Sequence, residues 1–175
     1  MSDPGPGCAE SGRADAGSAF GRTMIREYRD DDLVATAAVW LSAGQAEYHY
    51  LPEFQKLSAA SVVPIFSVAI RACCEIRVFE SDGDIAGFIA MKDCVVDRLY
   101  VDPPRQNRGI GSTLLSFAKR ERPGGLTLFT HRQNYRARAF YEKHGFIAVG
   151  FGLSPAPESM PDVEYQWKPE QPAQG

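Results

Sequence analysis

The residues whose types and spacing best suggest chemistry form a glycine-containing turn, Gln106-Asn107-Arg108-Gly109-Ile110-Gly111-Ser112, between an extended segment and a helix. The first turn of a helix presents backbone N–H groups without intrahelical partners, together with a partial positive charge. Glycines allow a ligand to approach the backbone closely, and Arg105 and Arg108 add formal positive charge. The turn therefore predicts a site for an anion of the size of a pyrophosphate.

Two other phosphate-binding motifs do not fit this turn. The dinucleotide fingerprint Gly-x-Gly-x-x-Gly fails because Leu114 stands at the third glycine position. The P-loop fails because no Gly-Lys-Ser/Thr follows. Taken alone, two glycines at a helix start serve packing more often than ligand binding, so the turn needs support from elsewhere in the chain.

The charge distribution is uneven along the chain. Nine Lys or Arg and only two acidic residues lie between Arg105 and Lys143, a local balance of +7 in a chain of 175 residues whose net charge is −3. A basic segment within an acidic protein is typical of a locally held polyanionic ligand. Solvated helix faces explain several of these charges equally well. The scattered Arg residues lack the interleaved aromatic platform of a nucleic-acid surface, so no nucleic-acid partner is expected.

Hydrophobic periodicity and turn signals predict a mixed α/β chain. In the N-terminal half we expect a strand from Met24, a helix capped by Asp30–Asp32 and ending near Ser42, a helix over 58–72 that is irregular at Pro64, and strands over 75–80 and 85–91 joined at Asp82-Gly83-Asp84. In the C-terminal half we expect a strand over 94–101, a helix from Asn107 to about Arg120, a strand over 126–130, a helix over 134–144, and strands over 146–151 and 163–167.

A second motif, Asn134-x-x-Ala137-x-x-Phe140-Tyr141-x-x-x-Gly145-Phe146, follows the turn at a distance of one strand. Together, the strand Leu99–Pro103, the turn Gln106-x-x-Gly109-x-Gly111 and this motif resemble the GCN5-related N-acetyltransferases, the GNAT superfamily. The order, spacing and element types agree, and the resemblance extends more loosely over residues 24–168. It implies a six- to seven-stranded, mostly antiparallel mixed sheet flanked by helices. It also implies a reaction in which an acetyl group moves from acetyl-coenzyme A to a primary amine.

The resemblance implies a role for each matching position. The backbone of Leu99, Tyr100 and Val101 would pair with the pantetheine arm as an added strand. Asn134 would bond the pantetheine or shape its cleft, and Tyr141 would direct its hydroxyl at the thioester sulfur. The backbone N–H groups that would hold the pyrophosphate belong to Gln106, Asn107, Arg108, Gly109, Ile110, Gly111 and Ser112. The sheet would splay near Asp97 to Leu99, at a β-bulge.

The implied mechanism is direct attack of the amine on the thioester in a ternary complex. Backbone N–H groups near Leu99 or Tyr100 would stabilise the oxyanion, and Tyr141 would hydrogen-bond or protonate the departing thiolate. The base stays open among Asp97, His131, His49, Glu47 and a chain of waters. The acceptor, a small-molecule amine or a peptide amine, would contact residues 44–57 and 154–162; aromatic groups among acids favour a cationic one.

The remaining expectations concern the whole chain. Residues 1–22 and 169–175 are expected to be disordered tails around an acetyltransferase domain at residues 23–168. No apolar run could span a membrane, and no secretory signal is recognisable, which favours the cytoplasm. Four cysteines without Cys-x-x-Cys spacing argue against a metal site. Many members of the family are dimers, but no interface is specified, so a homodimer stays open. The competing hypothesis is a catalytically silent acyl-coenzyme A sensor or partner module.

Overall fold

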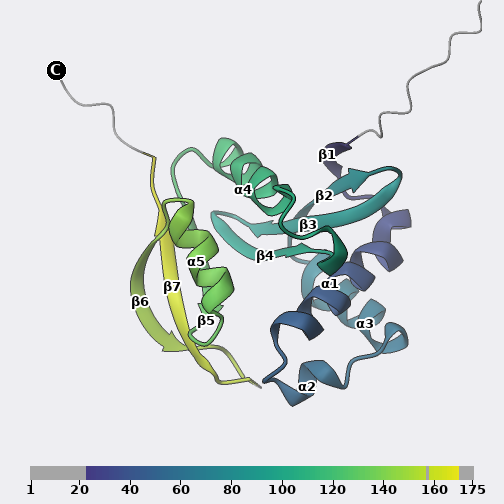
Figure 1. Cartoon of the computed structure of the whole chain (residues 1–175), viewed down its shortest axis with the longest axis horizontal. Helices are drawn as coiled ribbons and strands as arrows, with labels where there is room; N and C mark the ends of the chain where they lie inside the picture. Colours follow the sequence, from purple (N-terminus) through teal and green to yellow (C-terminus); the bar gives the residue numbers. More distant parts are fainter. Residues whose placement is uncertain (1–22, 157, 170–175) are drawn as a thin grey trace, which may run out of the picture.

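A computed structural model describes residues 23–156 and 158–169 of the chain. The tails expected at 1–22 and 169–175 lie outside the described residues, apart from Pro169. Figure 1 shows one sheet with helices packed on both of its sides.

The sheet has seven strands in the order β1-β2-β3-β4-β5-β7-β6. All neighbouring strands are antiparallel except β4 and β5, which are parallel. The strands are β1 (Thr23–Glu27), β2 (Glu75–Ser81), β3 (Asp84–Lys92), β4 (Val95–Val101), β5 (Leu126–His131), β6 (Ile147–Leu153) and β7 (Pro161–Trp167). This topology confirms the predicted mixed, mostly antiparallel sheet.

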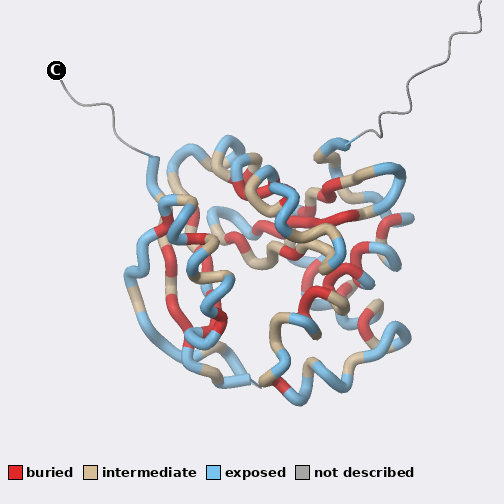
Figure 2. Tube along the Cα trace, viewed as in Figure 1, coloured by how far each residue is buried: buried red, intermediate tan, exposed pale blue. Residues whose placement is uncertain are grey.

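Helices cover both faces of the sheet and enclose two hydrophobic clusters. The helices are α1 (Leu33–Glu47), α2 (Pro52–Gln55), α3 (Ala59–Phe66), α4 (Ile110–Glu121) and α5 (Tyr135–Lys143). One cluster joins α4 and α5 to the sheet through residues such as Leu114, Leu115 and Tyr165. The other joins α1 and α3 to the opposite face through residues such as Trp40, Phe66 and Phe88. Figure 2 shows buried residues concentrated along the central strands and on the inner sides of these helices.

The N-terminal helical region differs from the sequence prediction. Helix α1 runs to Glu47, beyond the expected end at Ser42, and the short helix α2 was not expected. Gly44 lies within α1, and the ring of Phe54 packs where its Cβ would stand, 2.2 Å from the ring Cζ. The expected helix over 58–72 is α3, which contains Pro64, followed by a π-helical turn at Ser67–Arg71.

The first strand is tied to the entry of α1 by charged side chains. Arg26 on β1 donates from Nη1 and Nη2 to the Asp32 carboxylate, at 2.7 and 2.9 Å. Asp32 also accepts from the Arg29 backbone N–H at 2.7 Å. These hydrogen bonds tie the start of α1 to β1. Asp32 is the N-cap residue of α1, but its side chain makes no capping hydrogen bond to this helix, unlike the capping role expected for Asp30–Asp32.

Candidate functional site

A β-bulge opens the sheet between β4 and β5. In the β3–β4 register Ala90 faces Arg98 and Met91 faces Val96, so Asp97 is the extra residue on β4. Strands β4 and β5 pair only at Val95–Thr127 and Val96–Leu128. From the bulge onward, the backbone of Leu99 to Val101 therefore has no strand partner on the β5 side. The structure confirms the splay expected near Asp97 to Leu99, and an extended ligand can pair with this free edge.

The glycine turn leads from the open edge of β4 to the first turn of α4. Asn107 and Gly109 have positive φ angles of 60° and 82°. These left-handed residues delay the helix to Ile110, so the expected start near Asn107 was wrong. The first intrahelical bond from the turn runs from the Thr113 N–H to the Gly109 carbonyl oxygen, at 2.9 Å. A Cβ on Gly109 would meet no atom within 4 Å, so the turn is open to a ligand.

The side chains around the turn differ in what they contact. Gln106 donates from Nε2 to the Val101 carbonyl oxygen at 3.1 Å and accepts from Arg136 at 3.3 Å, which ties β4, the turn and α5 together. Arg108 is exposed. Arg105 points away, donating to Asp84 at 2.7 Å and to the Ser81 carbonyl oxygen at 3.2 Å. The Arg105 guanidinium, which was expected to attract the anion, therefore binds the β2–β3 hairpin instead.

Asn134 caps α5 and links it to α1. Its Oδ1 accepts from the Ala137 backbone N–H at 3.0 Å, as an N-cap side chain does. Its Nδ2 donates to the carboxylate of Glu47, the last residue of α1. Burial raises the pKa of the Glu47 carboxyl, although the Asn134 hydrogen bond and the charge of Arg136 oppose the shift. Asn134 thus positions a half-buried acidic group at the end of α1.

Tyr141 lies on α5, seven residues after Asn134. The side chain is buried and its ring packs beside Phe146 and Tyr165, with centroids 5.7 and 6.5 Å away. Among the described residues its hydroxyl contacts no hydrogen-bonding partner, in contrast to the Tyr165 hydroxyl, which donates to Glu142 at 2.5 Å. Burial raises the pKa of Tyr141 well above its ordinary value, and the nearby charge of Glu47 adds to the shift. The hydroxyl is therefore neutral and able to donate.

Aromatic residues connect the end of α1 to the side chain of Tyr100 on β4. The Tyr100 hydroxyl donates to that of Tyr48 at 3.2 Å, and the Tyr50 hydroxyl lies 3.2 Å from His131 Nδ1. Burial raises the pKa of Tyr100 to about 12 and that of Tyr50 to about 12. Glu158 lies 3.4 Å from His131 Nε2. Residues from the two predicted acceptor segments, 44–57 and 154–162, thus meet at His131.

Sequence reasoning named the backbone of Tyr100 but missed its side chain, which is buried in this cluster. It also missed the contact of Glu47 with Asn134 and the bond from Arg136 to Gln106. These pairs join separate elements, and no local motif indicates them.

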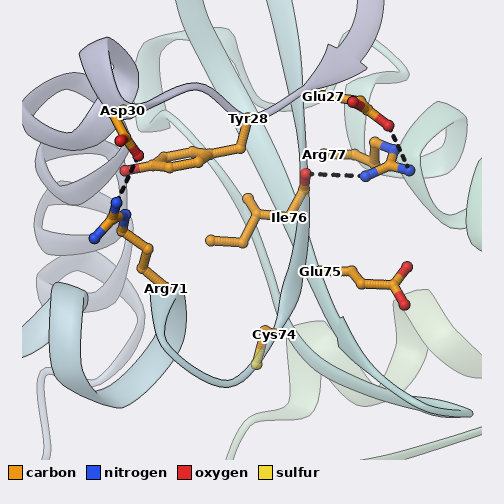
Figure 3. A pocket seen from close by; sticks show the side chains of 8 residues that line it. All are labelled: Glu27, Tyr28, Asp30, Arg71, Cys74, Glu75, Ile76 and Arg77. Atoms are coloured by element: carbon orange, nitrogen blue, oxygen red, sulfur yellow. Dashed lines mark hydrogen bonds and ion pairs between the residues drawn. The ribbon is translucent and has the colours of Figure 1, made fainter.

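A separate hollow of about 370 Å³ lies on the far side of β2, at Tyr28, Cys74 and Ile76 (Figure 3). Four of its charged residues pair with each other, Arg71 with Asp30 at 2.6 Å and Arg77 with Glu27 at 3.3 Å. None of the predicted site residues lines it. The neighbouring thiols of Cys73 and Cys74 are 3.6 Å apart, and burial raises the pKa of Cys74 to about 12, which keeps it a neutral thiol.

The sequence and the fold both match known acetyltransferases. Residues 72–148 match the family described as Acetyltransferase (GNAT) domain. The peptidyl-lysine N-acetyltransferase YjaB of Salmonella typhimurium is 29% identical over 126 residues, which cover 72% of this chain and 84% of that protein. The solution structure of apo YjaB from Escherichia coli has a TM-score of 0.66 at 23% identity, covering 83% of this chain and 97% of that one. The structure of yncA from Salmonella typhimurium with its cofactor acetyl-CoA has a TM-score of 0.62 at 17% identity, covering 88% and 98%.

The splayed sheet, the glycine turn and the family match define an acetyl-coenzyme A-dependent N-acyltransferase. Over residues 72–148 the chain resembles the GCN5-related N-acetyltransferase superfamily, as the two sequence motifs indicated. Within residues 23–156 and 158–169, no cluster of three or more His, Cys, Asp or Glu side chains could hold a metal ion. In the same part of the chain, no helix is long and apolar enough to cross a membrane.

Proposed function

We propose that residues 23–168 act as one domain that transfers the acetyl group of acetyl-coenzyme A to the side-chain amine of a peptide lysine. The observation that carries the proposal is the alignment of three features: the free edge of β4, the open first turn of α4 and the unpartnered hydroxyl of Tyr141. The name of YjaB supports a peptide lysine as the acceptor. So do the carboxylates of Glu47 and Glu158, which favour a cationic group.

The residues present fit coenzyme A along its length. The backbone of Leu99, Tyr100 and Val101 offers an unpaired edge to the amide groups of pantetheine. The pyrophosphate would lie against the backbone N–H groups from Gln106 to Ser112, where the open space at Gly109 admits it. Asn134 would flank the pantetheine from the start of α5, with its amide oriented by Glu47.

In the reaction, the amine nitrogen forms a bond to the thioester carbonyl carbon, and collapse of the tetrahedral intermediate breaks the carbon–sulfur bond. Backbone N–H groups near Leu99 or Tyr100 stabilise the oxyanion. Tyr141 donates a hydrogen bond to the departing thiolate. With ordinary pKa values near ~8.5 for a thiol and ~10 for tyrosine, full proton transfer costs roughly 2 kcal/mol. Because burial raises the pKa of Tyr141 further, a hydrogen bond that strengthens as charge develops is the role we assign.

We propose that Glu47 is the base that accepts the proton of the acceptor amine. A lysine ammonium, with a pKa near ~10.4, must lose a proton before it attacks. Asp97 is held by Arg98 at 3.3 Å, His131 lies between Tyr50 and Glu158, and His49 is exposed. Glu47 is half-buried beside Asn134, and its charge raises the pKa of Tyr141, so it lies close to both proposed cleft residues. It can hold the ammonium and accept its proton, directly or through a water.

The test combines binding and turnover. We expect micromolar acetyl-coenzyme A binding by calorimetry, and thiol release when a lysine peptide is added. A Gly109→Asp variant should lose binding, because its carboxylate would occupy the open space at the turn and face the pyrophosphate. Gly124→Asp is the matched control, since a Cβ at that glycine, beyond the other end of α4, also meets no atom within 4 Å. Binding without thiol release from any amine would favour the silent acyl-coenzyme A module, and a folded protein that binds none would refute the proposal.

A further inference from the structure

A hydrogen-bonded chain runs from the first turn of α4 to the end of α5. The Ser112 hydroxyl lies 2.9 Å from Nε2 of His144, and Nδ1 of His144 lies 2.7 Å from the Phe140 carbonyl oxygen. A carbonyl oxygen can only accept, so Nδ1 must carry a hydrogen. In neutral imidazole Nε2 is then the acceptor, and Ser112 donates its only hydroxyl hydrogen to His144.

This direction matters for an anion at the glycine turn. While Ser112 donates to His144, its hydroxyl presents only lone pairs to other neighbours, and lone pairs repel phosphate oxygens. If Nε2 acquires a proton, it becomes the donor, and the Ser112 oxygen becomes its acceptor. The Ser112 hydroxyl hydrogen is then free to point toward the phosphate. The Nδ1 hydrogen keeps its bond to Phe140 in both states, so the imidazole ring need not move.

Binding of an anion at the turn changes the net charge around His144. From α4, Lys119 donates from Nζ to the His144 backbone carbonyl oxygen at 2.5 Å, and its ammonium lies over the rings of Phe146 and Trp167. The positive end of α4 lies on the same side. On α5, the ring packs on Phe140, with centroids 4.4 Å apart, and the adjacent charged residues Glu142 and Lys143 are exposed. A pyrophosphate at the turn adds negative charge on the Ser112 side of the imidazole, which favours a proton on Nε2 in the complex.

We propose that His144 is a positioning residue for coenzyme A, which takes up a proton from solvent as the pyrophosphate binds and thereby turns the Ser112 hydroxyl toward it. The inference rests on the proposed function, because it takes the glycine turn to be the pyrophosphate site. In this step one solvent proton binds to Nε2 and the Ser112 hydroxyl rotates. No covalent bond other than this N–H bond forms. Acetyl-coenzyme A binding thus becomes tighter as pH falls through the range in which histidine titrates.

The test measures proton uptake directly. Calorimetric titrations with dephospho-coenzyme A in two buffers of different ionisation enthalpy give the number of protons bound with the ligand. Dephospho-coenzyme A is used because it lacks the 3′-phosphate, whose second pKa near ~6 would add protons of its own. Across about pH 6 to 8, the range of histidine titration, we expect the wild type to take up a fraction of one proton. Pantetheine, which has no phosphate, should bind without uptake.

Variants locate the proton. His144→Gln and Ser112→Ala should each abolish the uptake and weaken dephospho-coenzyme A binding about 10-fold, a change of roughly 1.4 kcal/mol. His49→Gln, at an exposed histidine in the loop after α1, is the matched control and should keep the uptake. Ser112→Ala preserves the test should His144→Gln not fold. Binding without uptake at any of these pH values, or uptake that persists in both variants, would overturn the role of His144 and leave the proposed function standing. No binding at all by folded wild type would instead refute the proposed function.

Discussion

At the scale of single residues, the hydroxyl of Tyr141 separates a catalytic role from a packing role. We expect Tyr141→Phe to keep the ring packing against Phe146 and Tyr165 while removing the donor, so acetyl-coenzyme A affinity should change little. The turnover number should fall about 100-fold, within the range of a lost general acid. Stopped-flow or steady-state thiol release, with calorimetric binding alongside, measures both. An unchanged turnover number would mean that Tyr141 has only a packing role in the core.

Glu47 should give the reaction its acid limb. Because burial raises the pKa of its carboxyl, the group becomes protonated, and unable to accept a proton, at a higher pH than an ordinary glutamate. We therefore expect turnover to fall as pH decreases through that raised pKa, and the alkaline form to be the active one. Glu47→Gln keeps an oxygen for Asn134 but cannot take the proton, so the acid limb should vanish together with most of the rate.

Profiles of the turnover number against pH, for wild type and Glu47→Gln, test this assignment. Glu53→Gln is the matched control, since that carboxylate is exposed on α2 and pairs only with Lys56. A limb that survives in Glu47→Gln would assign the proton to another group, such as His131.

The relative positions of site residues were predictable from sequence only where one element carries them. Asn134 and Tyr141 lie on one helix, seven positions apart, so their spacing alone predicts that both face the same cleft. The contact between Glu47 and Asn134 joins residues 87 positions apart, and nothing in the local sequence encodes it. The prediction that Arg105 adds positive charge to the anion site failed for the same reason. The sequence shows the charge, but the direction of the side chain depends on its contact with Asp84.

At the scale of elements, the ion pair of Arg26 with Asp32 joins β1 to α1 and should be pH-sensitive. The hydrogen bond from Arg26 lowers the pKa of the Asp32 carboxyl below its ordinary value. A lowered folded-state pKa contributes stability that is present above the unfolded value, near ~3.9, and is lost as pH falls through the folded one. We expect Asp32→Asn to lower the free energy of unfolding at neutral pH by about 1 to 3 kcal/mol.

Urea unfolding of both proteins at neutral and acidic pH checks this prediction. The difference between wild type and Asp32→Asn should shrink toward zero below the folded pKa. Asp30→Asn is the control, because Asp30 is largely exposed and its pair with Arg71 should contribute little. A difference that is constant with pH would mean that the asparagine disturbs packing instead.

The packing of α2 on α1 should set the shape of the acceptor cleft. A Cβ at Gly44 would lie 2.2 Å from Cζ of Phe54, so Gly44→Ala must displace that ring. Phe54 packs on Tyr48, with ring centroids 5.6 Å apart, and Tyr48 reaches Tyr100. We expect the KM for a lysine peptide to rise about 10-fold while acetyl-coenzyme A binding is kept. Gly124→Ala, where a Cβ meets nothing within 4 Å, should change neither constant.

Element types were largely predictable, whereas some element boundaries were not. The hairpin at Asp82-Gly83 and the helix over Tyr135–Lys143 follow from local turn and capping residues. Helix α1 continues through Gly44 to Glu47, and the packing of Phe54 against this glycine joins residues that are distant in the local pattern. The start of α4 depends on left-handed backbone at Asn107, which a polar, non-glycine residue did not suggest.

At the scale of the whole molecule, β6 forms one of the two edges of the sheet. Strand β6 pairs with β7 alone, and the segment 145–153 contains neither a charged residue nor a proline. Its large apolar side chains are strongly exposed: Ile147 69%, Val149 51%, Phe151 70% and Leu153 68%. The sequence predicted a strand here but not its edge position, because strand order depends on pairings between distant segments.

Edge strands are usually protected by charges, prolines or bulges, and here only a bulge between Ala148 and Gly150 interrupts the pairing register. We therefore expect wild type to self-associate at high concentration, and Phe151→Lys to reduce this association, because a lysine on an edge strand opposes pairing with another strand. Light scattering against protein concentration measures the effect. Val68→Lys adds the same charge at a residue that is 77% exposed in the π-helical turn, and it should leave the association unchanged. Equal effects of the two lysines would mean that net charge, and not the β6 edge, governs association.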